Sequence, residues 1–239
     1  EEESLFMLTY GGYIKRIPVS AYRKQKRGGS GVTGAGMRDD EDFIEHMFLS
    51  STRDTIMFFT NRGRAYWRKA YQIPEASRQA RGKAIVNLLS LTPEESISSL
   101  LQVTEFDDKR FVVMVTKNGV IKKTNLIQYS RPRTTGINAI TLRDKDELVS
   151  CKITNGNNEI FIATRKGKAI RFPEKQAREM GRTAGGVRGM SLEKGDEVIA
   201  AEVVDLKGTA LSISELGFGK KTPFKEYRLQ SRGSKGTIN

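Results

Sequence analysis

One short phrase recurs five times in this chain, and its spacing constrains the fold more than any other feature. In each copy an apolar run ends in Thr or Ser, a Gly follows three residues later, and a basic, apolar run comes next. The copies begin at Thr9, Thr60, Thr116, Thr164 and Ser214. Their anchor glycines, which define repeats 1 to 5, lie 51, 56, 48 and 50 residues apart and are Gly12, Gly63, Gly119, Gly167 and Gly217. A near-constant period of this length predicts a repeat architecture.

Each copy of the phrase predicts a β-hairpin. The apolar runs before the anchors cover residues 5–8, 56–59, 111–115, 160–163 and 210–213. A tight turn between two strands needs a positive φ, which Gly adopts at little cost. Because the runs before the turns are almost continuously apolar, we expect these strands to be buried on both faces.

Two further strands complete each repeat. Longer apolar runs introduced by an acidic residue begin at Asp42, Glu95, Asp146 and Asp196. Looser segments after the hairpins lead into residues 84–89, 137–140 and 186–189. About four short strands per period is typical of a propeller blade. The predicted fold is therefore all-β, with five propeller-like blades and little helix beyond single turns at 75–81 and 173–180.

Composition fits one folded domain over residues 1–239. Hydrophobic residues make up 37% of the chain, and no run of 18 apolar residues is present to span a membrane. The start, Glu1-Glu2-Glu3, indicates a cut from a longer polypeptide. The single cysteine, Cys151, excludes an internal disulfide, is compatible with a reducing cytoplasm, and is expected to be a small core residue.

The net charge of +13 is informative about partners. Nucleic acid is the first candidate and an anionic membrane surface the second. The sequence has no amphipathic basic helix, which disfavours the membrane.

Basic residues recur in register with the repeats. Four residues after the anchor stand Arg16, Lys123, Arg171 and Lys221, and repeat 2 has Trp67 there, followed by Arg68 and Lys69. Since repeats place equivalent residues at equivalent positions, these cations predict a belt of positive charge on one edge. Such a belt would contact phosphates without reading base sequence, and salt would weaken its binding.

A second glycine also recurs, 19 residues after the anchor in four repeats. An Arg precedes each of these glycines by four residues, and the four pairs are Arg27 with Gly31, Arg78 with Gly82, Arg182 with Gly186, and Arg232 with Gly236. In repeat 3 the glycine comes two residues early, as Gly136, with Arg133 three residues before it.

Residues 22–36 carry the most specific motif. A Gly-rich stretch of this kind can be a flexible linker, but here Lys24, Lys26 and Arg27 lead into closely spaced glycines. Glycine lets the backbone approach a phosphate, so that its N–H groups act as donors beside the basic side chains. The segment is not a P-loop, because no Gly-Lys-Ser/Thr follows at the required spacing.

Gln25-Lys26-Arg27-Gly28-Gly29-Ser30-Gly31 resembles the seven-residue box, Gln-Arg-Arg-Gly-Gly-Lys-Gly, of the C-terminal domain of DNA gyrase A. Residues 73–82, continuing to 85–89, are similar to the second blade of that domain, and residues 58–64 and 180–184 also resemble it. The resemblance covers essentially the whole chain. Two positions depart from the box: Lys26 loses the planar fork of Arg, and Ser30 removes a charge.

The resemblance implies a DNA-wrapping module of a type IIA topoisomerase. The family fold is a β-pinwheel, usually of six blades, in which neighbouring blades share strands. The implied partners are duplex DNA and, in an A2B2 gyrase holoenzyme of the bacterial cytoplasm and nucleoid, gyrase B and the rest of gyrase A. The holoenzyme would use ATP and Mg²⁺ to introduce negative supercoils. No cofactor is expected in this domain itself.

The candidate DNA-binding residues are the box and the basic residues at or beside the repeat positions. They are Gln25, Lys26, Arg27, Gly28, Gly29, Ser30, Gly31, Lys15, Arg16, Arg62, Arg64, Arg68, Lys69, Arg78, Arg81, Lys122, Lys123, Arg131, Arg133, Lys166, Lys168, Arg171, Arg182, Arg188, Lys220, Lys221, Arg232 and Lys235.

Three alternatives remain open at this stage. One is the equivalent domain of topoisomerase IV, which lacks an intact box; another is a propeller scaffold for an acidic protein partner. The least favoured is an enzyme, since His46 is the only histidine and the acidic run 39–42 is more typical of a solvated loop than of a Mg²⁺ site. Tyr66 and Trp67 could stack on bases, but core packing is the favoured interpretation.

Overall fold

The computed structural model describes residues 2–22 and 42–239. Within them the chain forms strands and short 3-10 helices, with no α-helix. Two sheets come from the first part of the chain. Their strand orders are β3 (Ile44–Ser51), β1 (Glu3–Thr9), β2 (Tyr13–Pro18), β6 (Lys83–Ala84), and β10 (Ile137–Asn138), β5 (Arg64–Lys69), β4 (Thr55–Thr60), β7 (Ile97–Val103).

Two more four-stranded sheets and one hairpin follow. Their strand orders are β11 (Leu148–Thr154), β8 (Phe111–Thr116), β9 (Val120–Asn125), β14 (Val187–Arg188); β15 (Val198–Val203), β12 (Glu159–Thr164), β13 (Lys168–Pro173), β18 (Thr237–Ile238); and β16 (Thr209–Ile213) with β17 (Gly219–Pro223). The 3-10 helices are η1 (Val19–Ala21), η2 (Ala70–Gln72), η3 (Ile85–Asn87), η4 (Leu126–Tyr129), η5 (Glu174–Gln176) and η6 (Phe224–Glu226).

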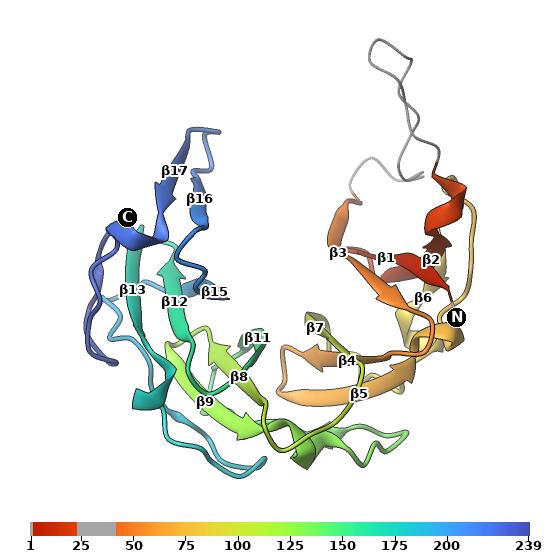
Figure 1. The fold of residues 1–239 in the computed structure, drawn as a ribbon, viewed down its shortest axis with the longest axis horizontal. Coiled ribbons are helices and arrows are strands. Elements are labelled where there is room, and N and C mark those ends of the chain that lie inside the picture. The colour runs from red at the N-terminus through yellow and green to blue at the C-terminus, as the bar shows by residue number, and fades with distance from the viewer. Residues whose placement is uncertain (1, 23–41) are drawn as a thin grey trace. The chain divides into compact units, whose positions relative to one another are not determined.

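The five predicted hairpins are confirmed. Figure 1 shows them as the arrow pairs β1–β2, β4–β5, β8–β9, β12–β13 and β16–β17. Every anchor glycine has a positive φ, from 76° at Gly63 and Gly167 to 83° at Gly217. The all-β fold with blades of four strands is confirmed as well. The helical turn expected at 173–180 is η5, whereas residues 75–81 form turns and a β-bridge rather than a helix.

Each four-stranded sheet is completed by a strand from the following repeat. The chain leaves the sheet of β1 and β2 to form hairpin β4–β5, and it then returns to pair β6 with β2. In the same way β14 pairs with β9, and β18 pairs with β13. The short strand therefore fastens each repeat to the one before it.

The second repeated glycine makes this exchange possible. A Cβ on Gly82 would lie 2.5 Å from the carbonyl oxygen of Ile14, and one on Gly186 would lie 2.6 Å from that of Ile121. Gly236 is equivalent, 2.6 Å from the carbonyl oxygen of Ala169. Any side chain at these positions would collide with the backbone of the preceding repeat.

The acidic residues that introduce the long strands hold the hairpin turns. A carboxylate oxygen of Asp42, Asp146 and Asp196 accepts from the N–H of Gly11 (2.8 Å), Asn118 (2.9 Å) and Lys166 (3.0 Å), respectively. Burial acts to raise the pKa of Asp196, but hydrogen bonds from Thr164 and from the backbone outweigh it and lower that pKa. These aspartates therefore hold the hairpin turns in place.

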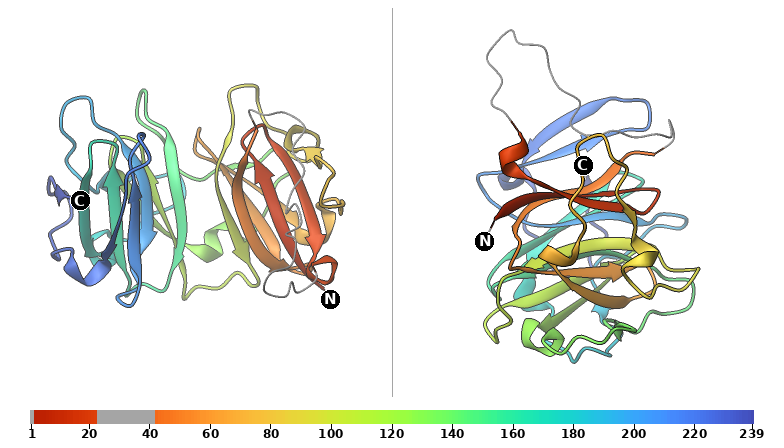
Figure 2. Two further views of the ribbon diagram at one scale, coloured as in Figure 1. Left: turned by 90° about the horizontal axis from the view of Figure 1, so that it is seen from above. Right: turned by 90° about the vertical axis from the view of Figure 1, so that its right-hand side faces the viewer.

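The contacts group the described chain into two compact units. Unit 1 comprises residues 1–58, 65–105 and 132–137, and unit 2 comprises 59–64, 106–131 and 138–239. The core of unit 1 includes Phe6, Phe58 and Tyr66, while that of unit 2 includes Val113 and Phe172. Figure 2 shows the sheets of unit 2, coloured from green to blue, as adjacent layers. The single domain over 1–239 stays a prediction.

Cys151 is 1% exposed, as expected for a core residue. No helix in the described part of the chain is long and apolar enough to cross a membrane.

Substitution of Gly186 by Ala should destabilise the chain by about 1–3 kcal/mol, because Ala strains a backbone at φ 81° and its Cβ meets Ile121. Urea unfolding would measure the change. Gly181 is the matched control, since nothing lies within 4 Å of a Cβ there. Equal midpoints for Gly186→Ala and Gly181→Ala would contradict the explanation.

Candidate nucleic-acid interface

Three members of the repeated basic series bind the 3-10 region of the next repeat. Arg171 is 9% exposed; its Nη1 donates to the carbonyls of Phe224 (3.1 Å) and Tyr227 (2.9 Å), and its Nε contacts Glu159 at 2.6 Å. Lys123 Nζ donates to the carbonyl of Glu174 at 3.4 Å. These cations thus tie the hairpin of one repeat to the 3-10 region of the next.

Arg16 repeats the arrangement in unit 1. Its Nε donates to the carbonyl of Ile73 at 3.0 Å, just after η2, and its Nη1 lies 3.0 Å from a carboxylate oxygen of Glu75. The backbones of the same three cations also form isolated parallel β-bridges with the next repeat. These bridges join Arg16 to Glu75, Lys123 to Glu179 and Arg171 to Leu229.

The preceding position is buried in two repeats. Lys15 Nζ donates to the carbonyls of Arg78 and Ala80, both at 2.7 Å. Lys122 is fully buried and donates to the carbonyls of Ala139 and Arg182. Burial, and then the charge of Arg182, lowers the pKa of Lys122 to about 7.

The solvent-facing belt predicted at these positions is therefore wrong for Lys15, Arg16, Lys122, Lys123 and Arg171. The register of the series is real, but the side chains point into the junctions between repeats. Only repeat 5 keeps both cations, Lys220 and Lys221, exposed. The five inward-facing residues are not part of the surface proposed below.

The arginines before the second glycine are also tied to the preceding repeat. Arg182 Nη1 donates to the carbonyl of Asn138 at 2.7 Å. Arg232 donates through Nε to the carbonyl of Gln176 at 2.7 Å, and through Nη1 to that of Arg188. Arg78 lies 5.9 Å from the centre of the Tyr22 ring. These guanidinium groups are half-buried, so part of each remains accessible.

The other candidates lie at or near the surface of the two units. Those that are exposed are Arg62, Lys69, Arg131, Arg133, Lys166, Arg188, Lys220, Lys221 and Lys235. Those that are half-buried are Arg64, Arg68, Arg78, Arg81, Lys168, Arg182 and Arg232. Exposed cations occur in repeats 2 to 5, and they form the candidate phosphate-binding surface. The box, residues 25–31, lies outside the described residues.

Sequence reasoning missed Arg143. This exposed residue lines a cleft of about 480 Å³ in unit 2 together with Arg188, Asn118 and the apolar Met190 and Leu192. The two guanidinium groups make the cleft a second place where a phosphate can bind. Arg143 stands at no repeated position, so the periodic signal could not identify it.

Among the described residues no group of three or more His, Cys, Asp or Glu side chains is placed to hold a metal ion. Tyr66 and Trp67 are 1% and 5% exposed, as the core-packing interpretation predicts.

Substitution of Arg171 by Met should destabilise the fold by about 3 kcal/mol, because it removes the ion-pair partner of the partly buried Glu159 and two hydrogen bonds to backbone carbonyls. The equivalent exposed residue supplies the control: Lys221→Met should leave the urea midpoint unchanged. If both positions served DNA alone, the two variants would unfold alike and weaken duplex binding equally.

The free energy of unfolding should depend on the protonation of Lys122. Folding lowers its pKa from 10.5 to about 7, so between these values the unfolded chain binds the extra proton. Stability from this group should therefore rise with pH across that window, by up to about 1.4 kcal/mol per unit. Urea titrations of the unsubstituted chain and Lys122→Met from pH 6 to 10 would measure the difference. Parallel curves would contradict a buried lysine that titrates.

Comparisons with known proteins agree with this geometry. The family model "DNA gyrase C-terminal domain, beta-propeller" matches residues 3–51, 54–104, 110–155, 158–205 and 209–239. The DNA gyrase A protein of Helicobacter pylori is 46% identical over 239 residues, covering 99% of this chain and 29% of that relative. The DNA gyrase A protein of Buchnera aphidicola is 44% identical over 238 residues, covering 100% and 28%.

Two solved structures share the fold across nearly the whole chain. The C-terminal domain of DNA topoisomerase IV superposes with a TM-score of 0.81 at 27% identity, covering 99% of this chain and 72% of that one. The DNA gyrase A C-terminal domain gives 0.79 at 26%, covering 99% and 76%. The chain spans less than a third of the curated relatives' length. With all five repeats matched, it belongs to the family of DNA gyrase C-terminal β-propeller domains.

Proposed function

We propose that this chain binds duplex DNA without reading its sequence and bends it into a wrap of positive writhe. The observation that carries the proposal is the recurrence of exposed cations in successive repeats. Arg62 belongs to repeat 2, Arg131 and Arg133 to repeat 3, Lys166 and Arg188 to repeat 4, and Lys220, Lys221 and Lys235 to repeat 5.

Distributed contacts suit a wrapping module. Bending 20–30 base pairs through a large angle costs on the order of 1–6 kcal/mol. Many phosphate contacts along the path can each offset part of this cost, whereas one strong site would hold the duplex at a single point. The binding term comes from counterion release and is independent of base sequence.

Within the whole protein the module would present a wrapped segment to the rest of DNA gyrase. Its partners would be the remainder of the gyrase A polypeptide and the gyrase B polypeptide, in an A2B2 assembly in the bacterial cytoplasm. That assembly would use ATP and Mg²⁺ to introduce negative supercoils, while the module itself would have an accessory, non-catalytic role. The curated DNA gyrase A relatives, at 44% and 46% identity, support this context.

The equivalent domain of topoisomerase IV is the second candidate, because the solved topoisomerase IV domain superposes as well as the gyrase one. The box separates the two. Replacing Arg27, Gly28 and Gly29 by Ala should abolish supercoiling by a reconstituted gyrase holoenzyme and spare relaxation. Unchanged supercoiling would favour the topoisomerase IV role.

A nicked circle ligated while bound to the chain should trap a positive linking difference. Raising salt from about 50 to 200 mM should weaken duplex affinity about 10³- to 10⁵-fold if six to ten phosphates are contacted. The trapped linking difference should disappear at the salt concentration at which duplex binding is lost. Salt-sensitive binding with no trapped writhe would reduce the module to simple duplex binding, and salt-insensitive binding would favour a protein scaffold.

A further inference from the structure

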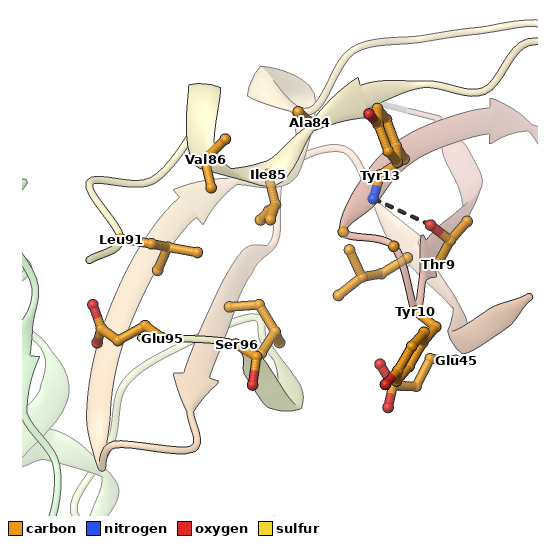
Figure 3. A pocket seen from close by; sticks show the side chains of 14 residues that line it. Thr9, Tyr10, Tyr13, Glu45, Ala84, Ile85, Val86, Leu91, Glu95 and Ser96 are labelled. Atoms are coloured by element: carbon orange, nitrogen blue, oxygen red, sulfur yellow. Dashed lines mark hydrogen bonds between the residues drawn. The ribbon is translucent and has the colours of Figure 1, made fainter. Parts of the chain in front are cut away.

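A cleft in unit 1 differs in character from the basic surface. It lies between the turn of hairpin β1–β2 and the segment that follows β6, and its volume is about 540 Å³. Figure 3 shows Tyr10 and Glu45 on one side of the cleft and Leu91 and Glu95 on the opposite side, with Ile85 between.

At the rim of this cleft two aromatic residues occupy positions that hold an ion pair in repeats 3 and 4. Tyr10 and Phe43 stack with ring centres 5.0 Å apart, although they are 66% and 51% exposed. At the equivalent positions of repeat 3, Lys117 pairs with Glu147 at 3.6 Å. In repeat 4, Arg165 pairs with Glu197 at 3.0 Å.

Val86, another lining residue, is 61% exposed. It belongs to the segment after β6 and lies across the cleft from Tyr10 (Figure 3). The cleft therefore has exposed apolar side chains on both of its walls.

The cleft is also acidic within a chain of net charge +13. Glu95 accepts hydrogen bonds from Tyr66 (2.9 Å) and from the N–H of Thr92 (2.8 Å), so its role is structural. Glu45 on β3 presents the other carboxylate, and partial burial raises its pKa. A carboxylate on the wall of a cleft can pair with a cationic partner.

An arginine of the chain itself already stacks on a tyrosine that lines the cleft. The guanidinium carbon of Arg81 lies 3.6 Å from the centre of the Tyr13 ring, and the charge of Arg81 contributes to lowering the pKa of Asp42. An arginine can therefore stack on tyrosine and complement a carboxylate at this end of the sheet.

The exposure of the lining residues indicates whether the ligand is a free small molecule or part of a larger partner. Tyr10, Glu45, Val86 and Ser96 are all exposed, so the cleft cannot enclose most of a free small molecule. A side chain presented by a larger partner suits it better, because contacts outside the cleft then add to the binding.

We infer that this cleft binds an arginine side chain from an extended, basic segment of a protein partner. The guanidinium lies against the Tyr10 ring and pairs with Glu45, while an apolar neighbour of the arginine packs against Val86 and Leu91. This site is separate from the proposed DNA-binding function and does not depend on it.

The test is an NMR titration of the ¹³C,¹⁵N-labelled 239-residue chain with acetyl-Leu-Arg-Leu-amide. Saturable shifts are expected at Tyr10, Val86 and Leu91. Acetyl-Leu-Gln-Leu-amide should bind at least about tenfold more weakly, as should the arginine peptide to Glu45→Gln and Tyr10→Ala, because each change removes a cation–π or charge contact. Tyr10→Phe keeps the ring and should keep most of the affinity.

The matched controls, Tyr71→Ala and Glu3→Gln, change exposed residues outside the cleft and should leave peptide binding intact. Duplex affinity should be the same in all variants, so failure of the DNA proposal would be seen separately. Absence of saturable shifts, or equal affinity for the Gln peptide, would overturn the inference.

Discussion

The structure depends on backbone groups of one repeat being satisfied by the next. A hairpin and one long strand leave a sheet edge with unpaired N–H and C=O groups, which is costly when buried. The short strands β6, β14 and β18 cover these edges, and glycines without a Cβ allow the approach. Each blade consequently needs a strand from the following repeat to complete its sheet and is not an independent module.

Cations complete the same junctions. Arg16, Lys123 and Arg171 bind carbonyls around the short helices of the next repeat, and Lys15 and Lys122 bind carbonyls of its long loop. The Lys and Arg residues thus fall into two groups. One group of cations holds neighbouring repeats together, and the other remains exposed at the surface.

The sequence predicted much of the fold because the period, the turn glycines and the apolar runs are local signals. It could not predict the direction of the repeated basic side chains. A position four residues after the anchor repeats equally well whether it faces solvent, as Lys221 does, or a neighbour's carbonyls, as Arg171 does. That choice depends on the strand exchange, which pairs residues about seventy positions apart in the sequence. Arg143, which lines the cleft in unit 2, was missed because it stands at no repeated position.

The two kinds of junction contact respond differently to dissolved ions. Lys117 bridges Glu147 and Glu197 at the surface, so added salt screens it, while the carbonyl contacts of Arg171 and Lys122 lie where salt hardly penetrates. A rise in ionic strength should therefore weaken the ion pairs at the surface and leave the buried contacts between repeats in place.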